Sequence, residues 1–254
     1  MREHILSLLV PPACAICRRP LRDGRAVACT GCLRRLPWLR GHRCPCCALP
    51  RHREGCPAAR AAFDRAWAPL AYEGAARDLV AALKFRAALP VAGLMAAHVA
   101  ANLPADLRRG TWAACTSADR GGGTWAAVRP ADVRGPPARA APLAVVPVPA
   151  HRGRRRRRGF DAAALLAAAV AGRTGLPLTP CLRRVDRGRR QVGAGRVLRR
   201  SAGRFEAALV AAPPRAALLV DDVHTTGATL DACARALKAG GAEAVAAVTY
   251  ARTL

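Results

Sequence analysis

Residues 218–229 read Leu-Leu-Val-Asp-Asp-Val-His-Thr-Thr-Gly-Ala-Thr, and this stretch decides the fold. The apolar run Ala216 to Val220 predicts a buried strand, and a helix is expected from Thr229 to Ala239, closed by Gly240-Gly241. The turn between them offers hydroxyl groups, backbone N–H groups and the positive end of a helix dipole, which together suit a phosphate. Because ligands of open parallel sheets bind beyond the carboxyl ends of the strands, the stretch predicts a phosphate site in an α/β fold.

Two adjacent carboxylates follow this strand directly. They only accept hydrogen bonds, which suits a ribose diol or a bound Mg²⁺. A carboxylate pair beside a phosphate-binding turn therefore indicates a phosphorylated sugar. The alternative is an ordinary strand and capped helix with solvated carboxylates. The residues expected to bind ribose and phosphate are Asp221, Asp222, Thr225, Thr226, Gly227, Ala228 and Thr229.

The rest of the chain alternates between strand-like and helix-like patterns. Helical spacing runs from Ala76 to the polar end Lys84-Phe85-Arg86, and a second helix is expected over Val91–Asn102. Leu143–Val148 and Ala244–Tyr250 predict strands, and Asp161 predicts the cap of a helix that runs to Val170. This alternation favours a parallel sheet with helices on both faces.

Periodicity is lost over residues 104–142, which we expect to be a flexible surface insertion. The segment holds Gly121-Gly122-Gly123 and Pro136-Pro137. Its tryptophans, Trp112 and Trp125, are consistent with a contact site or with an unstructured loop.

Cysteine clustering predicts metal in the first 60 residues. Eight of the eleven cysteines lie between Cys14 and Cys56, and this segment has little apolar pattern from which to build a core. The pairs Cys14-x₂-Cys17 and Cys29-x₂-Cys32 fit one tetrahedral, structural Zn²⁺ with no open position. We therefore expect a zinc-ribbon-like module over residues 1–60 and an α/β domain over residues 61–254.

A second group of cysteines resembles another zinc site that lacks one cysteine ligand. Cys44, Cys47 and Cys56 have suitable spacing, but Ala59 stands where a fourth cysteine would complete the pattern. His52 is the expected fourth ligand, with Cys46 or His42 as substitutes, and a metal-free knuckle is the alternative. The isolated residues Cys115, Cys181 and Cys233 are expected to be ordinary thiols.

The chain resembles the type I phosphoribosyltransferases at residues 218–229, and the ComF family of competence-associated proteins over nearly its whole length outside residues 104–142. The ComF resemblance rests on the cysteine pairs and on four further stretches in the same order. These are Ala71-Tyr72-Glu73-Gly74 through Leu83-Lys84-Phe85-Arg86, Val146-Pro147-Val148-Pro149, Arg157-Arg158-Gly159-Phe160, and Gln191-Val192-Gly193.

The resemblance implies a type I phosphoribosyltransferase fold that binds 5-phosphoribosyl-1-pyrophosphate (PRPP) with Mg²⁺. Residues 147–154 would form the pyrophosphate loop, and residues 187–205 would close over the reacting centre. The implied pyrophosphate contacts are Lys84, Arg86, Pro149, His151, Arg152 and Arg154. The catalytic candidates on the closing loop are Arg196 and Arg199.

Two positions depart from the family pattern. Asp161 stands where the family has asparagine, and no asparagine occurs between Gln191 and Phe205. The departures leave the ribose-phosphate segment intact and affect the expected chemistry of the closing loop.

The formal net charge of +26 fits a polyanionic partner, and it also fits a GC-rich genome, since the over-used residues Arg, Ala, Gly and Pro all have GC-rich codons. The arginines at 152 and 154–158 are more specific, because they follow a strand where a pyrophosphate loop is expected. Arg152 and Arg154 are expected to contribute more to PRPP binding than Arg157 and Arg158. Single-stranded DNA is expected as a second partner of the run. Few aromatic residues are present for base stacking, which weakens the DNA hypothesis.

No apolar run reaches the roughly 20 residues that span a bilayer, so a soluble, cytoplasmic protein without membrane insertion is expected. Three functions remain open. They are transfer of phosphoribose to an unidentified acceptor, sensing of PRPP or a nucleotide, and, as the family implies, uptake of transforming DNA together with DNA-uptake proteins.

Overall fold

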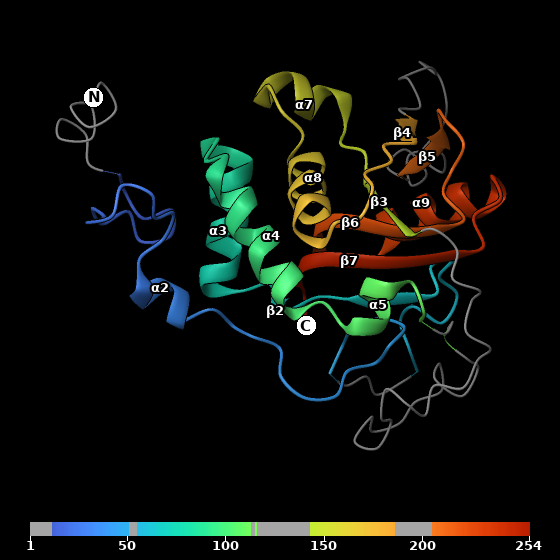
Figure 1. Ribbon diagram of the computed structural model, residues 1–254, viewed down its shortest axis with the longest axis horizontal. Coiled ribbons are helices and arrows are strands. Elements are labelled where there is room, and N and C mark those ends of the chain that lie inside the picture. The colour runs from blue at the N-terminus through green and yellow to red at the C-terminus, as the bar shows by residue number, and fades with distance from the viewer. Residues whose placement is uncertain (1–11, 51–54, 113–114, 116–142, 186–204) are drawn as a thin grey trace, which may run out of the picture.

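The computed structural model describes residues 12–50, 55–112, 115, 143–185 and 205–254 (Figure 1). The strands are β1 (Arg65–Trp67), β2 (Leu70–Ala71), β3 (Leu143–Pro147), β4 (Leu182–Val185), β5 (Glu206–Leu209), β6 (Ala216–His224) and β7 (Ala244–Arg252). The helices are α2 (Thr30–Arg34), α3 (Gly74–Arg86), α4 (Pro90–Asn102), α5 (Ala105–Arg109), α7 (Arg152–Arg158), α8 (Ala162–Thr174) and α9 (Ala228–Ala239). In this part of the chain, none of the helices combines the length and apolar character required to cross a membrane.

A parallel sheet forms the centre of the molecule. Its strand order is β1-β7-β6-β3, β2 also pairs with β7, and every pair is parallel. Side chains of β6 alternate between two cores: Leu218 and Val220 pack in the core that includes α3, α4 and α8, whereas Ala217 and Leu219 pack in the core that includes α9. The prediction of a parallel sheet flanked by helices is confirmed.

Strand β6 is longer than the apolar run predicts, because it ends at His224 and includes both aspartates. The ladder between β6 and β7 continues through Asp221↔Thr249 to His224↔Arg252. The ladder between β6 and β3 stops at Pro147↔Val220. Asp221 and Asp222 therefore lie in extended backbone that is paired on one side only.

The N-terminal segment shares its core with the α/β domain. Leu36 is buried among the apolar side chains of α3 and α4. Trp38 forms a β-bridge with Leu70 and meets the His98 ring edge-on at 5.3 Å between ring centroids. The cysteine-rich segment therefore packs against the sheet along its later part.

The first residues of the predicted insertion are folded. Residues 105–109 form α5, which buries Leu107, and Trp112 is only 2% exposed. Asp106 of α5 pairs with Arg65 of β1. A five-residue helix with one buried leucine gives almost no periodic signal, which explains why the sequence pattern misses it. Residues 116–142, including Trp125, lie outside the described residues.

Asp161 caps helix α8, as the sequence predicts, and it also holds the preceding loop. Its Oδ1 accepts hydrogen bonds from the backbone N–H groups of Ala163 (3.1 Å) and Ala164 (3.2 Å). Its Oδ2 accepts from the N–H of Ala150 at 3.1 Å. Both carboxylate oxygens are therefore used, one by the helix and one by the loop that follows β3.

We predict that Asp161→Ala lowers the free energy of unfolding by about 1–3 kcal/mol, because it removes the cap and leaves the Ala150 N–H without its acceptor. Asp161→Asn is expected to cost less, since its amide oxygen can still cap the helix while its NH₂ group cannot accept from Ala150. Urea denaturation of the three proteins checks this order. Equal stability of Asp161→Ala and wild type would show that the cap contributes nothing.

Candidate functional site

A cavity of about 270 Å³ opens at the carboxyl edge of the sheet. Seven of the residues predicted from the sequence line it: Lys84, Pro149, His151, Asp221, Asp222, Thr225 and Thr229. The lining also includes Arg158, from the predicted phosphate-binding arginine run, and Phe205, from the end of the predicted closing loop. Four further lining residues carry no binding role in the sequence prediction: Tyr72, Asp161, Arg184 and Val223. Tyr72 and Arg158 belong to stretches that support the family resemblance, so their positions in the sequence give a signal.

The carboxylate pair and a lysine form the polar centre of the cavity. Lys84 Nζ lies 2.7 Å from Asp222 Oδ1, and Asp222 is 5% exposed. The backbone N–H of Asp222 donates to Asp221 Oδ1 at 2.8 Å. Burial, followed by repulsion from Asp222, raises the pKa of Asp221 to about 8. The cavity thus holds a carboxyl group that favours a proton or another cation at neutral pH.

Glycine is required in the turn that follows β6. Gly227 has a φ of 81°, and a Cβ atom there would lie 2.8 Å from Nε2 of His224. His224 is buried and meets the Phe63 ring edge-on. Burial, with a smaller contribution from Arg252, lowers the pKa of His224 to about 3, so the imidazole is neutral. A neutral ring packed beneath the turn leaves room only for glycine above it.

The remaining turn residues lead into α9. The N–H of Ala228 donates to Thr226 Oγ1 at 3.4 Å, and α9 begins at Ala228. Thr226, Gly227 and Ala228 do not line the cavity, whereas the flanking residues Thr225 and Thr229 do.

The basic residues that the sequence predicts for pyrophosphate binding do not all line the cavity. Arg86 does not line the cavity, because its guanidinium donates to the carbonyl oxygens of Ala15 and Asp78. His151 caps α7, with its Nδ1 accepting from the Gly153 N–H at 3.0 Å. Arg152 is exposed and does not line the cavity, and the side chain of Arg154 lies outside the described part of the structure. Arg196 and Arg199 lie outside the described residues.

Arg158, at the end of helix α7, reaches the cavity instead. Its guanidinium carbon lies 5.0 Å from the centre of the Phe85 ring. Arg155, Arg156 and Arg157 are exposed or nearly so and do not line the cavity. The arginine run therefore divides along the helix: Arg158 lies at the cavity, whereas Arg152 and the three arginines from 155 to 157 lie outside it.

The first cysteine cluster has the geometry of a zinc site. The sulfur atoms of Cys14, Cys17, Cys29 and Cys32 all lie within 4.8 Å of one another, and Cys17 and Cys29 are 3.8 Å apart. A tetrahedral zinc with bonds of about 2.3 Å places its ligands roughly 3.8 Å apart. Burial alone would raise the pKa of Cys14, but hydrogen bonds from neighbouring backbone N–H groups outweigh it and lower that pKa to about 6. Cys14 therefore favours the thiolate that a metal requires, whereas burial raises the pKa of Cys32 to about 11.

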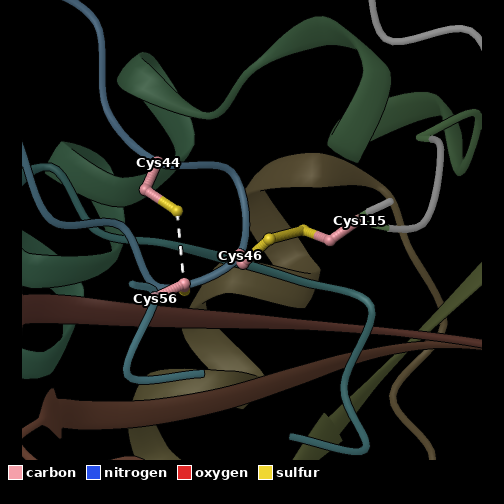
Figure 2. Close-up of a disulfide and its surroundings, with 4 residues drawn as sticks. All are labelled: Cys44, Cys46, Cys56 and Cys115. Carbon is pink, nitrogen blue, oxygen red and sulfur yellow. Dashed lines mark hydrogen bonds between the residues drawn. A yellow bond between two sulfur atoms is a disulfide. The ribbon is translucent and has the colours of Figure 1, made fainter. Parts of the chain in front are cut away.

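The second cluster includes Cys46, which the sequence prediction gives as a substitute ligand. Cys44, Cys46 and Cys56 have sulfur atoms within 4.8 Å of one another, and the Cys44–Cys56 distance is 3.7 Å (Figure 2). Cys47 is buried beside them, and its thiol interacts with those of Cys44 and Cys56. His52, the expected fourth ligand, lies outside the described residues.

The prediction that Cys115 is an ordinary thiol is wrong. Cys115 forms a disulfide with Cys46 (Figure 2). The two residues are 69 positions apart, and sequence alone does not give such a connection. Cys46 is available as a metal ligand only when this disulfide is reduced. Cys181 and Cys233 are free and buried, as expected.

Comparison with known proteins identifies the N-terminal part of the chain. Residues 5–62 match the family described as double zinc ribbon domain. This match and the two cysteine clusters support structural zinc. No curated protein sequence matches the chain.

The raised pKa of Asp221 predicts a pH-dependent stability. Between the ordinary value of 3.8 and about 8, the folded protein binds more protons at this position than the unfolded chain, so stability falls as pH rises. Asp221→Asn does not titrate, and its amide oxygen can still accept from the Asp222 N–H. The variant is therefore expected to gain stability relative to wild type progressively from pH 4 to pH 8.

Urea unfolding at pH 5 and pH 8 without added Mg²⁺ measures this difference. Glu243→Gln is the control, because Glu243 pairs with Arg215 at the surface, away from the cavity. A difference between Asp221→Asn and wild type that is the same at both pH values would refute the raised pKa.

Proposed function

We propose that the cavity binds PRPP with Mg²⁺, and that the chain is a ComF-like protein of the type I phosphoribosyltransferase superfamily. One observation carries the proposal: two adjacent carboxylates, Asp221 and Asp222, share a cavity with the phosphate-type turn that ends in Thr229. A site for phosphate alone would not place carboxylates there, because they repel it. A site for a phosphorylated sugar with a divalent cation needs both.

The chemistry of the groups that line the cavity supports a distinct role for each. The hydroxyl groups of Thr225 and Thr229, with the first N–H groups of α9, suit the 5-phosphate. Asp221 and Asp222 suit the ribose hydroxyl groups or the metal. Lys84 and Arg158 line the same cavity and suit the pyrophosphate, whose negative charge grows as its bond to ribose breaks.

The reaction we propose is attack of an acceptor on C1 of the ribose, with inversion and release of pyrophosphate. Bound Mg²⁺ would neutralise part of the charge on that leaving group. Lys84 is poised for exchange, because its present partner is Asp222 and it can turn toward pyrophosphate when a cation replaces it there. Arg196 and Arg199 remain the proposed cationic residues of the closing loop.

We predict that Asp221→Asn combined with Asp222→Asn weakens PRPP binding on the order of 100-fold or more, since two ligand-binding anions are lost. Calorimetry in the presence of Mg²⁺ measures the affinity, and Glu243→Gln is the matched control. A folded double variant that binds PRPP as wild type does would overturn the proposal. Pyrophosphate release across a panel of nucleobases then separates an enzyme from a PRPP sensor.

We also propose single-stranded DNA as a second ligand, on the exposed part of helix α7. Arg155, Arg156 and Arg157 are adjacent cations at the surface that do not line the cavity. Such residues contact phosphates without sequence preference.

Each Arg→Gln replacement among these three arginines is expected to reduce the salt slope of single-stranded DNA binding by about 0.7, and to leave PRPP affinity unchanged. Fluorescence anisotropy with an oligonucleotide across a salt series measures the slope, and Arg215→Gln is the control on another surface. Salt slopes that match the control would remove α7 from the DNA contact.

A further inference from the structure

Arg252, at the end of β7, lies between the second cysteine cluster and the turn that follows β6. The residue is 4% exposed. Its Nε donates to the Cys47 carbonyl oxygen at 3.0 Å, and its Nη1 donates to the carbonyl oxygens of His224, at 2.9 Å, and of Thr225. One buried side chain therefore ties the cysteine knuckle to the first residue of the proposed phosphate turn.

The positive charge of Arg252 needs compensation. An arginine stays charged in proteins, and burying that charge is unfavourable unless an anion is near. The three carbonyl oxygens satisfy its hydrogen bonds but carry no net charge. Within the described residues, no carboxylate pairs with Arg252, and the acidic groups that act on it are the thiols of Cys47 and Cys56.

We propose that a metal ion held by the second cysteine cluster supplies this compensation, and that Arg252 transmits its presence to the phosphate turn. Three thiolates on Zn²⁺ carry a net charge of −1, and four carry −2. The sign is the same whichever group is the fourth ligand. Protonated thiols are neutral, so loss of the metal leaves the guanidinium buried without a counter-charge.

A shift of Arg252 would change the position of the turn that follows β6. Arg252 holds the His224 carbonyl, and the His224 ring lies directly beneath Gly227. Movement at the end of β6 would therefore move the residues that begin α9, where we propose that the 5-phosphate binds. This part of the inference rests on the proposed function.

The first cysteine cluster provides a natural control. It meets the domain at Arg86 of α3, which donates to the Ala15 carbonyl oxygen, and at Leu94 of α4, which packs against it. Within the described residues, no hydrogen bond or ion pair joins this cluster to Arg252 or His224. Loss of metal there should leave the turn unchanged.

The first experiment measures zinc affinity in the absence of PRPP. Fully reduced full-length protein is titrated with a chromogenic chelator, and Arg252→Gln is compared with wild type and with Arg215→Gln, an exposed control. Arg252→Gln is expected to weaken one of two zinc sites by about 10–100-fold and to leave the other unchanged. Unchanged affinity at both sites, or one zinc per chain in wild type, would overturn the proposal.

The second experiment measures PRPP by calorimetry with Mg²⁺ present. Cys56→Ser should lose one zinc and bind PRPP about tenfold or more weakly, whereas Cys17→Ser should lose the other zinc and keep its affinity. Full PRPP affinity in zinc-deficient Cys56→Ser refutes the link to the turn. If Cys56→Ser fails to fold, PRPP affinity of Arg252→Gln decides instead. Failure of wild type to bind PRPP would reject the proposed function, while the zinc titration still decides the role of Arg252.

Discussion

The pairing of β6 with β7 beyond the end of β3 is the constraint on which the cavity depends. Because β7 extends to Arg252, its ladder keeps β6 extended through His224 after β3 has stopped at Pro147. The period of a strand then places successive aspartates on opposite faces. Asp222 faces the α3 side, where it meets Lys84. Asp221 faces the α9 side, where burial, with a further contribution from Asp221, raises the pKa of Cys233. One ladder thus gives two neighbouring carboxylates different neighbours, although both line the same cavity.

The cysteine-rich segment contributes to this architecture more closely than an appended module would. Its later part supplies Leu36 to the core of the α/β domain, and Cys47 accepts a hydrogen bond from the last strand of the sheet. A segment with little apolar surface of its own gains stability both from metal and from the surface it covers. The zinc ribbons and the sheet therefore form one folded unit at the second cluster.

The sequence predicts the elements with strong periodic patterns and misses those fixed by distant contacts. The helices that become α3, α4, α8 and α9 follow from apolar spacing, the Asp161 cap and terminal glycines, and the structure confirms them. The extension of β6 depends on the length of β7, which no local pattern shows. The burial of Trp112, the Cys46–Cys115 disulfide and the short pair β4–β5 depend on residues far apart in the chain. For the cavity, motifs predict the carboxylates, the turn and Lys84. The sequence gives the arginine run more weight at Arg152, and only the structure shows that Arg158 is the member at the cavity.

The cavity gathers carboxylates in a chain that is otherwise strongly basic, and this contrast supports the proposal of a cation-dependent ligand. The chain has a formal net charge of +26, yet Asp161, Asp221 and Asp222 line one cavity. Lys84 pairs with Asp222, and Asp161 is held by backbone N–H groups, which leaves Asp221 with a raised pKa and no cation of its own in the described structure. Clustered carboxylates reduce the stability of a fold, so a chain rich in arginine could relieve them simply by placing a guanidinium beside Asp221. Lys84, Arg158 and Arg184 also line the cavity. Under the proposed function, Asp221 would receive the cation that arrives with the ligand, as Mg²⁺ does with a pyrophosphate.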